Sequence, residues 1–286
     1  MKPATIFGLL GLLWLPSQSL SAQEREVKEQ IKREFKLAAD RGTLAVYNIF
    51  GSVTVEGYNG ATVVVEATKT IRARDAQTLA QGQQEAQLGF EQRGDSLVVY
   101  LQGPQDSRPR RNRYYNSRDI EYEYEFDFVV RVPAALRVSV STVNGGQVLV
   151  QNVTGPLQAR NVNGPVTVRN ARQATLAHTI NGDVAVSYAA APTQPASYHT
   201  INGNIVVSYP ASVSADVYFK SMHGELFTDF PRVEVLPARV TQNKDRDGQG
   251  TTYKLRKETA VRLGKGGPEM RFETLNGDVT IKQQPR

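Results

Sequence analysis

The chain has 286 residues, of which 40% are hydrophobic and 22% charged, which is typical of a soluble globular protein with a sizeable core. Its formal net charge of +6 permits contact with anionic polymers or lipid head groups but is too small to indicate nucleic-acid binding. The absence of cysteine excludes a disulfide framework, a thiolate metal site, a cysteine nucleophile and a lipid-modified cysteine.

The first 22 residues have the layout of a secretory signal peptide. Lys2 precedes an apolar run from Ile6 to Leu15, and small residues follow Pro16 up to Ala22. A membrane anchor is the alternative, but this run of ten residues is shorter than the roughly 20 that span a hydrocarbon core. We therefore predict export, with cleavage after Ala22, to the periplasm, the cell surface or the extracellular space.

The region that follows is interpreted as a lead-in over residues 23–42, for which a short helix from Glu24 to Ala39 is considered, and an N-terminal β region over residues 43–135. Apolar residues alternate from Thr43 onward, which predicts strands. One helix is predicted near residues 75–88, because Asp75 suits an N-cap and apolar residues then recur at helical spacing up to Gly89.

A basic and aromatic loop is predicted over residues 105–118. One interpretation is a site for an anionic polymer or single-stranded nucleic acid, since arginines attract phosphates and tyrosines stack on bases. The other is a solvated loop neutralised within the molecule, because the strand at 121–128 places four carboxylates on one face and four aromatic residues on the other. We favour the second interpretation. The side chains available to an anionic ligand would be Arg108, Arg110, Arg111, Arg113, Tyr114 and Tyr115.

One phrase recurs through residues 136–286: an aliphatic residue, Asn, Gly, a turn residue and an apolar-x-apolar strand. The clearest copies start at Val162, Ile180, Ile201 and Leu275. Up to Gly224 the glycines are spaced 18–21 residues apart, and the period then fails at a polar loop near residues 240–252. Asn-Gly turns would suit a meander of hairpins. Near-constant spacing favours an all-β fold of the β-solenoid type, in which like residues stack about 4.8 Å apart.

When the copies are aligned on their Asn, the residues at each aligned position form a column with shared chemistry. Val162, Ile180, Ile201 and Leu275 precede the Asn and form an apolar column that we expect to be buried. One position earlier every copy has a small hydrogen-bonding side chain, and stacked amides and hydroxyls can bond from coil to coil. We therefore interpret the repeated residues as structural. They are Asn144, Gly145, Asn163, Gly164, Asn181, Gly182, Asn202, Gly203, Gly224, Asn276 and Gly277.

Carboxylates at matched positions raise the question of catalysis. Asp183, Glu225 and Asp278 follow the turn glycine in different copies, and glycoside hydrolysis uses two carboxylates about 5 to 10 Å apart. Turn chemistry explains Asp at this position without catalysis. We therefore predict that the protein is not an enzyme.

Two histidines also fall at matched positions. His178 and His199 each lie three residues before an Asn, so they would stack on adjacent coils and are the weak candidates for a metal site. An outward polar column is the favoured interpretation, and no metal or other cofactor is expected. The same column contains Arg160, Lys220 and Glu273.

The Asn-Gly-x-Val copies, Val132-Pro133 after an alternating strand, and the closing segment from Gly264 to Val279 resemble a bacterial β-strand-repeat domain of unknown function, commonly labelled "putative adhesin". The similarity covers Thr43 to Lys282. It implies an exported or membrane-associated β-solenoid of the cell envelope and supplies no catalytic residues. The Arg-Tyr loop and the Gln/Glu helix depart from common relatives, so the resemblance implies no shared ligand.

These observations predict a non-enzymatic, exported repeat protein of the bacterial cell envelope that acts as an adhesin-like binding or scaffold module. The expected partners are an envelope glycan, an anionic surface polymer or another envelope protein. One alternative is an envelope-stress or signalling component that senses a ligand through its repeats. A less favoured alternative is a β-helix enzyme acting on polysaccharides.

Overall fold

The structure, a computed structural model, describes residues 25–38, 41–109, 119–237, 240–244, 251–255 and 258–285. The predicted signal peptide, residues 1–22, lies outside the described residues. Within them the chain forms strands and one helix, which confirms the all-β class. Ten strands form one sheet, eleven form a second, and two form a separate hairpin.

Consecutive strands of the second half alternate between the two large sheets. In the eleven-stranded sheet lie β8 (Arg137–Ser141), β10 (Leu157–Arg160), β12 (Thr175–His178) and β14 (Ala196–His199). In the ten-stranded sheet lie β9 (Val148–Gln151), β11 (Val166–Ala171), β13 (Val184–Tyr188) and β15 (Ile205–Tyr209). Val166 lies opposite Val184, and Val184 lies opposite Ile205, in parallel pairs. The predicted lateral register is therefore confirmed, and the hairpin alternative is wrong for these strands. We call one such pair of strands, one from each sheet, a rung.

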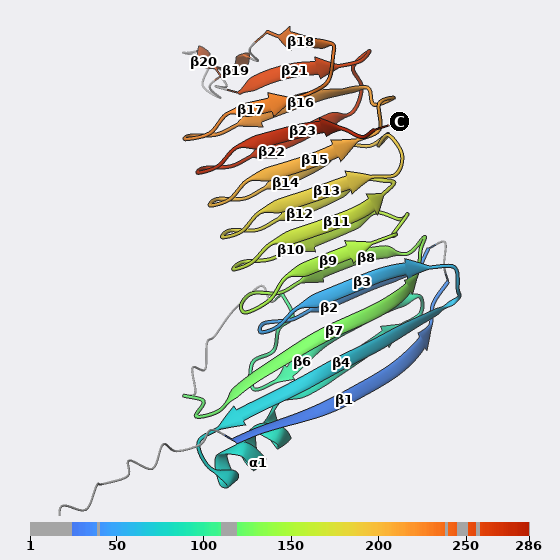
Figure 1. Ribbon diagram of the computed structural model, residues 1–286, viewed down its shortest axis with the longest axis vertical. Helices are drawn as coiled ribbons and strands as arrows, with labels where there is room; N and C mark the ends of the chain where they lie inside the picture. Colours follow the sequence, from blue (N-terminus) through green and yellow to red (C-terminus); the bar gives the residue numbers. More distant parts are fainter. Residues whose placement is uncertain are drawn as a thin grey trace, which may run out of the picture.

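The order of the rungs in space differs from their order along the chain. After β15 the chain forms β16 (Ala215–Lys220) and β17 (Leu226–Thr228), and it later returns with β22 (Glu269–Glu273) and β23 (Val279–Gln283). The returning pair lies between the β14–β15 rung and the β16–β17 rung, as the red strands between orange ones show in Figure 1.

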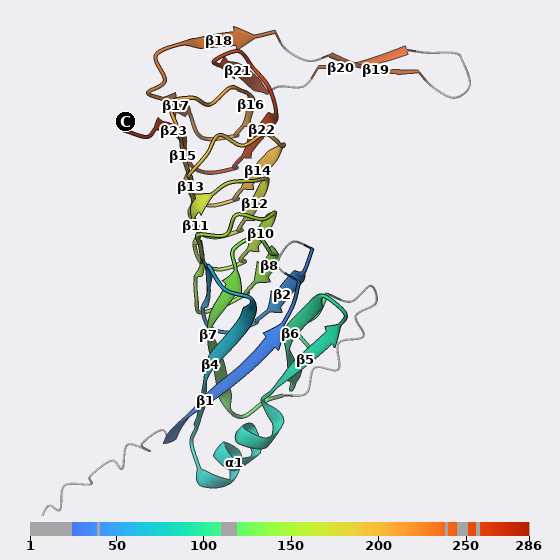
Figure 2. The ribbon, with the colours of Figure 1, turned by 90° about the vertical axis from the view of Figure 1, so that its right-hand side faces the viewer.

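The segment between β17 and β22 caps this end of the molecule. β18 (Val233–Leu236) and β21 (Thr259–Leu263) extend the eleven-stranded sheet with antiparallel pairs. β19 (Val240–Lys244) and β20 (Thr251–Leu255) pair as a hairpin that projects sideways in Figure 2. These two strands lie at the position of the predicted hairpin or loop insertion near residues 240–252, of which residues 245–250 lie outside the described residues.

The N-terminal half begins with rungs of the same kind. β2 (Thr43–Tyr47) and β3 (Val53–Tyr58) lie beside β8 and β9, and β6 (Ser96–Gly103) and β7 (Glu123–Pro133) lie beyond them. Further out the pairing becomes antiparallel, with β4 (Thr62–Ala73) and β1 (Arg25–Lys36) in one sheet and β5 (Gln87–Arg93) in the other. Figure 2 shows the two sheets separating toward this end, where α1 (Ala76–Glu85) lies at the base.

The helix considered for Glu24–Ala39 is wrong, because Arg25–Lys36 is strand β1. Val27, Ile31 and Phe35 recur every four residues, a spacing that places them on one side of a helix and also on one side of a strand. This segment is a strand because it pairs antiparallel with β4 along its whole length. The helix predicted near residues 75–88 is confirmed as α1. It ends at Glu85 rather than near Gly89, because Ala86 is already extended and β5 begins at Gln87.

The expected burial of the apolar column is also wrong. Ile180 and Leu275 each keep 40% of their surface exposed, whereas Thr179, Thr200 and Thr274 are buried. Side chains alternate along a strand, so a buried Thr turns the next residue outward. The hydroxyls point inward because they have partners there. The Oγ1 of Thr179 donates to the Gly164 carbonyl and that of Thr200 to the Gly182 carbonyl, each at 2.8 Å, joining neighbouring rungs.

Candidate functional site

The Asn residues of the repeat bond to one another. The Nδ2 of Asn163 donates to Asn144, that of Asn181 to Asn163, and that of Asn202 to Asn181, over 2.6, 2.8 and 2.7 Å. Asn276 continues the row by donating to Asn202 over 2.8 Å. Each amide between the ends thus uses one of its two N–H donors and one acceptor site of its oxygen along the row, and these bonds join neighbouring rungs.

The carboxylates after the turn glycines bind backbone. The Oδ1 of Asp183 accepts the N–H of Asn204 over 2.8 Å, and the Oδ1 of Asp278 accepts the N–H of Glu225 over 3.0 Å. Each bond joins one rung to the next. A structural role therefore accounts for both aspartates.

The two matched histidines lie opposite each other in β12 and β14, with ring centroids 5.4 Å apart. The Nδ1 of His199 lies 3.5 Å from an oxygen of Glu273. Burial, followed by the nearby His199 and Arg160, lowers the pKa of His178 to about 4. In the part of the chain that the structure describes, no group of three or more His, Asp or Glu side chains could hold a metal ion.

The basic loop is described only at its start. Arg110, Arg111, Arg113, Tyr114 and Tyr115 lie outside the described residues.

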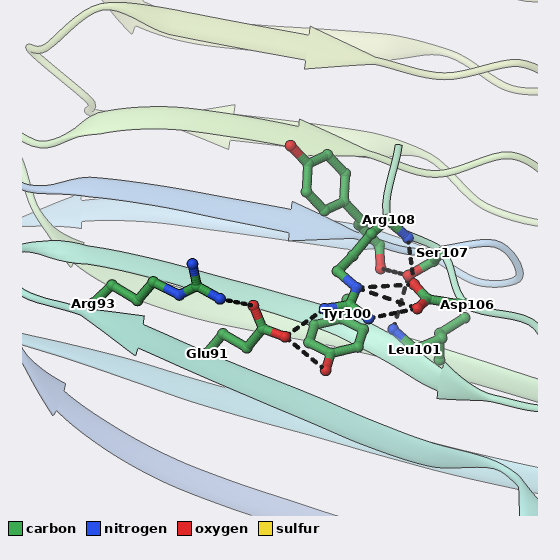
Figure 3. Close-up of polar contacts among 8 residues, drawn as sticks. Glu91, Arg93, Tyr100, Leu101, Asp106, Ser107 and Arg108 are labelled. Carbon is green, nitrogen blue, oxygen red and sulfur yellow. Dashed lines mark hydrogen bonds and ion pairs between the residues drawn. The ribbon is translucent and has the colours of Figure 1, made fainter. Parts of the chain in front are cut away.

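Figure 3 shows the surroundings of Arg108, which is described. Its guanidinium lies 3.9 Å from the centre of the Tyr100 ring, 2.6 Å from Asp106, and in an ion pair with Glu91. The hydrogen bond to Asp106 raises the pKa of Arg108. Its charge is therefore neutralised within the molecule, and its contacts leave it little freedom to bind an anionic polymer.

The sequence did not reveal a groove of about 530 Å³ on the outer face of the eleven-stranded sheet. Its floor is formed by Ser139, Gln158, Leu176 and Ser197 on four neighbouring strands. Parallel register aligns these residues, because Gln158 lies opposite both Ser139 and Leu176, and Leu176 lies opposite Ser197. One wall consists of Pro156, Ala174 and Pro195. The floor residues occupy one outward column, so the alignment of the repeats contained a signal for this site.

The two ends of the groove differ in charge. At the β22 end, Arg271 pairs with Glu269 and lies 3.4 Å from Glu258. At the other end lies Arg137, and Arg160 projects from the same face two residues after Gln158. Among the described residues, neither Arg137 nor Arg160 has an ion pair. The arginine at one end is thus paired with carboxylates, whereas the two arginines at the other end carry unpaired positive charge.

A second hollow, of about 580 Å³, lies beside Phe50, Ile120 and Tyr124. The Tyr124 hydroxyl is buried without a hydrogen-bond partner among the described residues, and burial raises its pKa to about 12. Because the oxygen is inaccessible, it cannot bond to a molecule in the hollow, and we place no site there.

No protein-family model and no curated protein sequence matches the chain. The resemblance to the β-strand-repeat family therefore stays a prediction. Among solved structures, a "putative cell adhesion protein" of Clostridium sporogenes is similar at 9% identity and a TM-score of 0.43, over 90% of this chain and 100% of that one. A "putative adhesin" of Bacteroides fragilis is similar at 10% identity and a TM-score of 0.34, over 90% and 97% of the two chains.

A search of the described residues for a helix with the length and apolar character of a membrane span finds none.

Proposed function

We propose that the chain is a non-enzymatic, exported binding protein of the bacterial cell envelope that holds an extended polysaccharide along its eleven-stranded sheet. In this proposal the rungs form a β-solenoid of 18–21-residue repeats, and the module acts in an adhesin-like way. The observation that carries the proposal is the groove across β8, β10, β12, β14 and β22.

The floor of the groove has the chemistry that a sugar polymer requires. Ser139, Gln158 and Ser197 offer hydroxyl and amide groups that both donate and accept hydrogen bonds. Leu176 and the wall prolines offer apolar surface for the C–H faces of sugar rings. Because neighbouring strands lie about 4.8 Å apart, these groups form a regular row that suits a linear chain of repeated units.

The scaffold also favours binding without a large entropic cost. Hydrogen bonds between rungs fix the floor residues before a ligand arrives, since Asn, Thr and Asp side chains tie each turn to the next. A preorganised surface loses little conformational freedom on binding. The carboxylates at the β22 end are held in ion pairs with Arg271, which supports a binding role rather than general acid-base catalysis.

The test is affinity electrophoresis and calorimetry of the purified chain against a panel of neutral and acidic envelope polysaccharides. We expect at least one polymer to bind, and the double variant Gln158→Ala/Ser197→Ala to weaken binding at least about tenfold. Thr167→Ala is the matched control, because Thr167 lies on a strand of the other sheet. Absence of binding across the panel, or equal loss in the control, would refute the proposal.

The export part of the proposal has a separate test. We expect mass spectrometry of the chain recovered from the envelope or medium to give an N-terminus at Gln23. An intact Met1 on protein that stays in the cytoplasm would contradict export.

A further inference from the structure

We infer that the bound polymer is an acidic polysaccharide, and that its anionic groups lie at the β8–β10 end of the groove between Arg137 and Arg160. The inference rests on the proposed function, because it names the ligand class of the same groove.

The register places the two arginines on either side of the groove floor. Arg137 is the first residue of β8, and Arg160 is the last residue of β10. Ser141 lies opposite Arg160, so the arginines stand four residues apart along the strands, about 13 Å at 3.3 Å per residue. Ser139 and Gln158 lie between them. A sugar ring bound to these two residues would therefore have a guanidinium on each side.

The charges around these arginines favour an anion. Other arginines of this sheet are neutralised nearby, since Arg271 pairs with Glu269 and Arg262 pairs with Asp216 over 2.8 Å. Within the described chain, Arg137 and Arg160 have no such partner. Among the described residues, the one carboxylate lining the groove, that of Glu269, lies at the far end and pairs with Arg271. Guanidinium groups bind carboxylates and sulfates through paired N–H donors, so an acidic sugar supplies the missing partner.

The groove is therefore directional. A neutral stretch of the polymer would lie over Leu176 and Ser197, and an anionic group would lie near Gln158. Solvent screens exposed charges, so each arginine adds a modest factor to affinity rather than carrying it. Two such contacts together correspond to about a tenfold preference for an acidic polymer over its uncharged counterpart.

The experiment compares polymers that share a backbone and differ in charge. Polygalacturonate and its fully methyl-esterified form test carboxylates, and dextran sulfate and dextran test sulfates. We expect calorimetry at low salt to show about tenfold tighter binding of the acidic member of at least one pair. Arg137→Gln and Arg160→Gln should each reduce that affinity about threefold and leave the uncharged member unaffected.

Arg169→Gln is the matched control, because it removes the same net charge from β11 of the other sheet. If the control reduces affinity as much as the groove variants, the preference comes from net charge and the inference is wrong. Equal binding of both members of each pair would also overturn the inference while leaving the proposed function intact. Failure of every polymer to bind, including the neutral ones, would instead remove the proposed function itself.

Discussion

The stack of Asn-Gly rungs and the N-terminal region around α1 are built from the same two sheets but are held together differently. In the stack, strands of three to six residues pair in parallel, and rows of like side chains join each rung to the next. In the N-terminal region, β1 and β4 run antiparallel for twelve residues each and are joined by ion pairs such as Arg72–Glu26 at 2.7 Å. A short rung cannot bury its apolar side chains alone, so the stack depends on close contact between neighbours.

This difference also decides where a ligand can bind. The N-terminal region uses its charges internally, as the contacts of Arg108 and the buried Lys69 show. In the stack, backbone groups, side-chain amides and hydroxyls form the hydrogen bonds between rungs. The side chains of its outward columns therefore remain available to a ligand. The long outer strand β1 carries Lys, Arg and Glu along its length, which protects the exposed edge from pairing with other chains.

The largest expected effect tests close contact between rungs. A Cβ added at Gly203 would lie 2.1 Å from the Gly182 carbonyl oxygen, and a backbone atom cannot rotate away. We expect Gly203→Ala to lower the free energy of unfolding by about 4 kcal/mol or more. Gly94, in the N-terminal region, has φ +56 but open space around it, so Gly94→Ala should cost only about 1 kcal/mol. Urea unfolding followed by far-UV circular dichroism gives both values. Equal costs would mean that rung contact is not what stabilises the stack.

The next effect separates the inner and outer faces of the stack. Ile205 is fully buried, so Ile205→Ala should cost about 3 kcal/mol through lost burial and a residual cavity. Ile180 keeps 40% of its surface exposed, so Ile180→Ala should cost less than about 1 kcal/mol. The same urea titrations measure both variants. A larger cost at Ile180 than at Ile205 would place the apolar column inside after all.

These two positions illustrate how much the sequence could predict. The Asn-Gly spacing correctly indicated rungs in lateral register, because turn residues and alternating apolar residues are local signals. A shift of one residue along a strand exchanges the side chains that face the core with those that face solvent. Hydrophobicity alone suggests that Ile180 faces the core, but Thr179 is the buried residue. Hydroxyl groups go inside here because glycine carbonyls of the next rung accept their hydrogen bonds, a contact visible only once the rungs are stacked.

The order of the rungs, and with it the β22 end of the groove, was beyond the sequence for a related reason. The last copy, at Asn276, pairs with Asn202 on one side and His223 on the other, although His223 precedes it by 53 residues. No local pattern indicates that the chain returns to an earlier position. The groove combines such non-local neighbours, because Ser197 and Arg271 meet only through the pairing of β14 with β22.

A smaller effect compares buried polar groups in the two regions. In the stack, the Tyr198 hydroxyl lies 2.7 Å from that of Tyr188 and 3.0 Å from that of Tyr209. Tyr198→Phe should cost about 2 kcal/mol, because the buried Tyr209 hydroxyl then loses its hydrogen-bonding side chain. In the N-terminal region, Lys69 donates to the Gln83 carbonyl over 2.7 Å, but Gln87 donates to the same oxygen. Lys69→Met should therefore cost less than about 1 kcal/mol. Unfolding free energies in the reverse order would contradict this account.

The smallest effect at neutral pH concerns His178, whose folded pKa of about 4 lies below its ordinary value of 6.5 because of burial, then His199 and Arg160. Above pH 6.5 the imidazole is neutral in both the folded and unfolded chains, so it adds no pH dependence. As the pH falls from 6.5 to 4 the unfolded chain takes up the proton first, and the free energy of unfolding decreases. We expect His178→Gln to flatten this part of the stability profile in urea titrations.

Arg160→Gln should raise the pKa of His178, measured by NMR of the ring protons, because it removes a nearby positive charge. An unchanged profile in His178→Gln would show that other groups govern acid sensitivity, and an unchanged pKa in Arg160→Gln would show that the two side chains do not interact across β10 and β12.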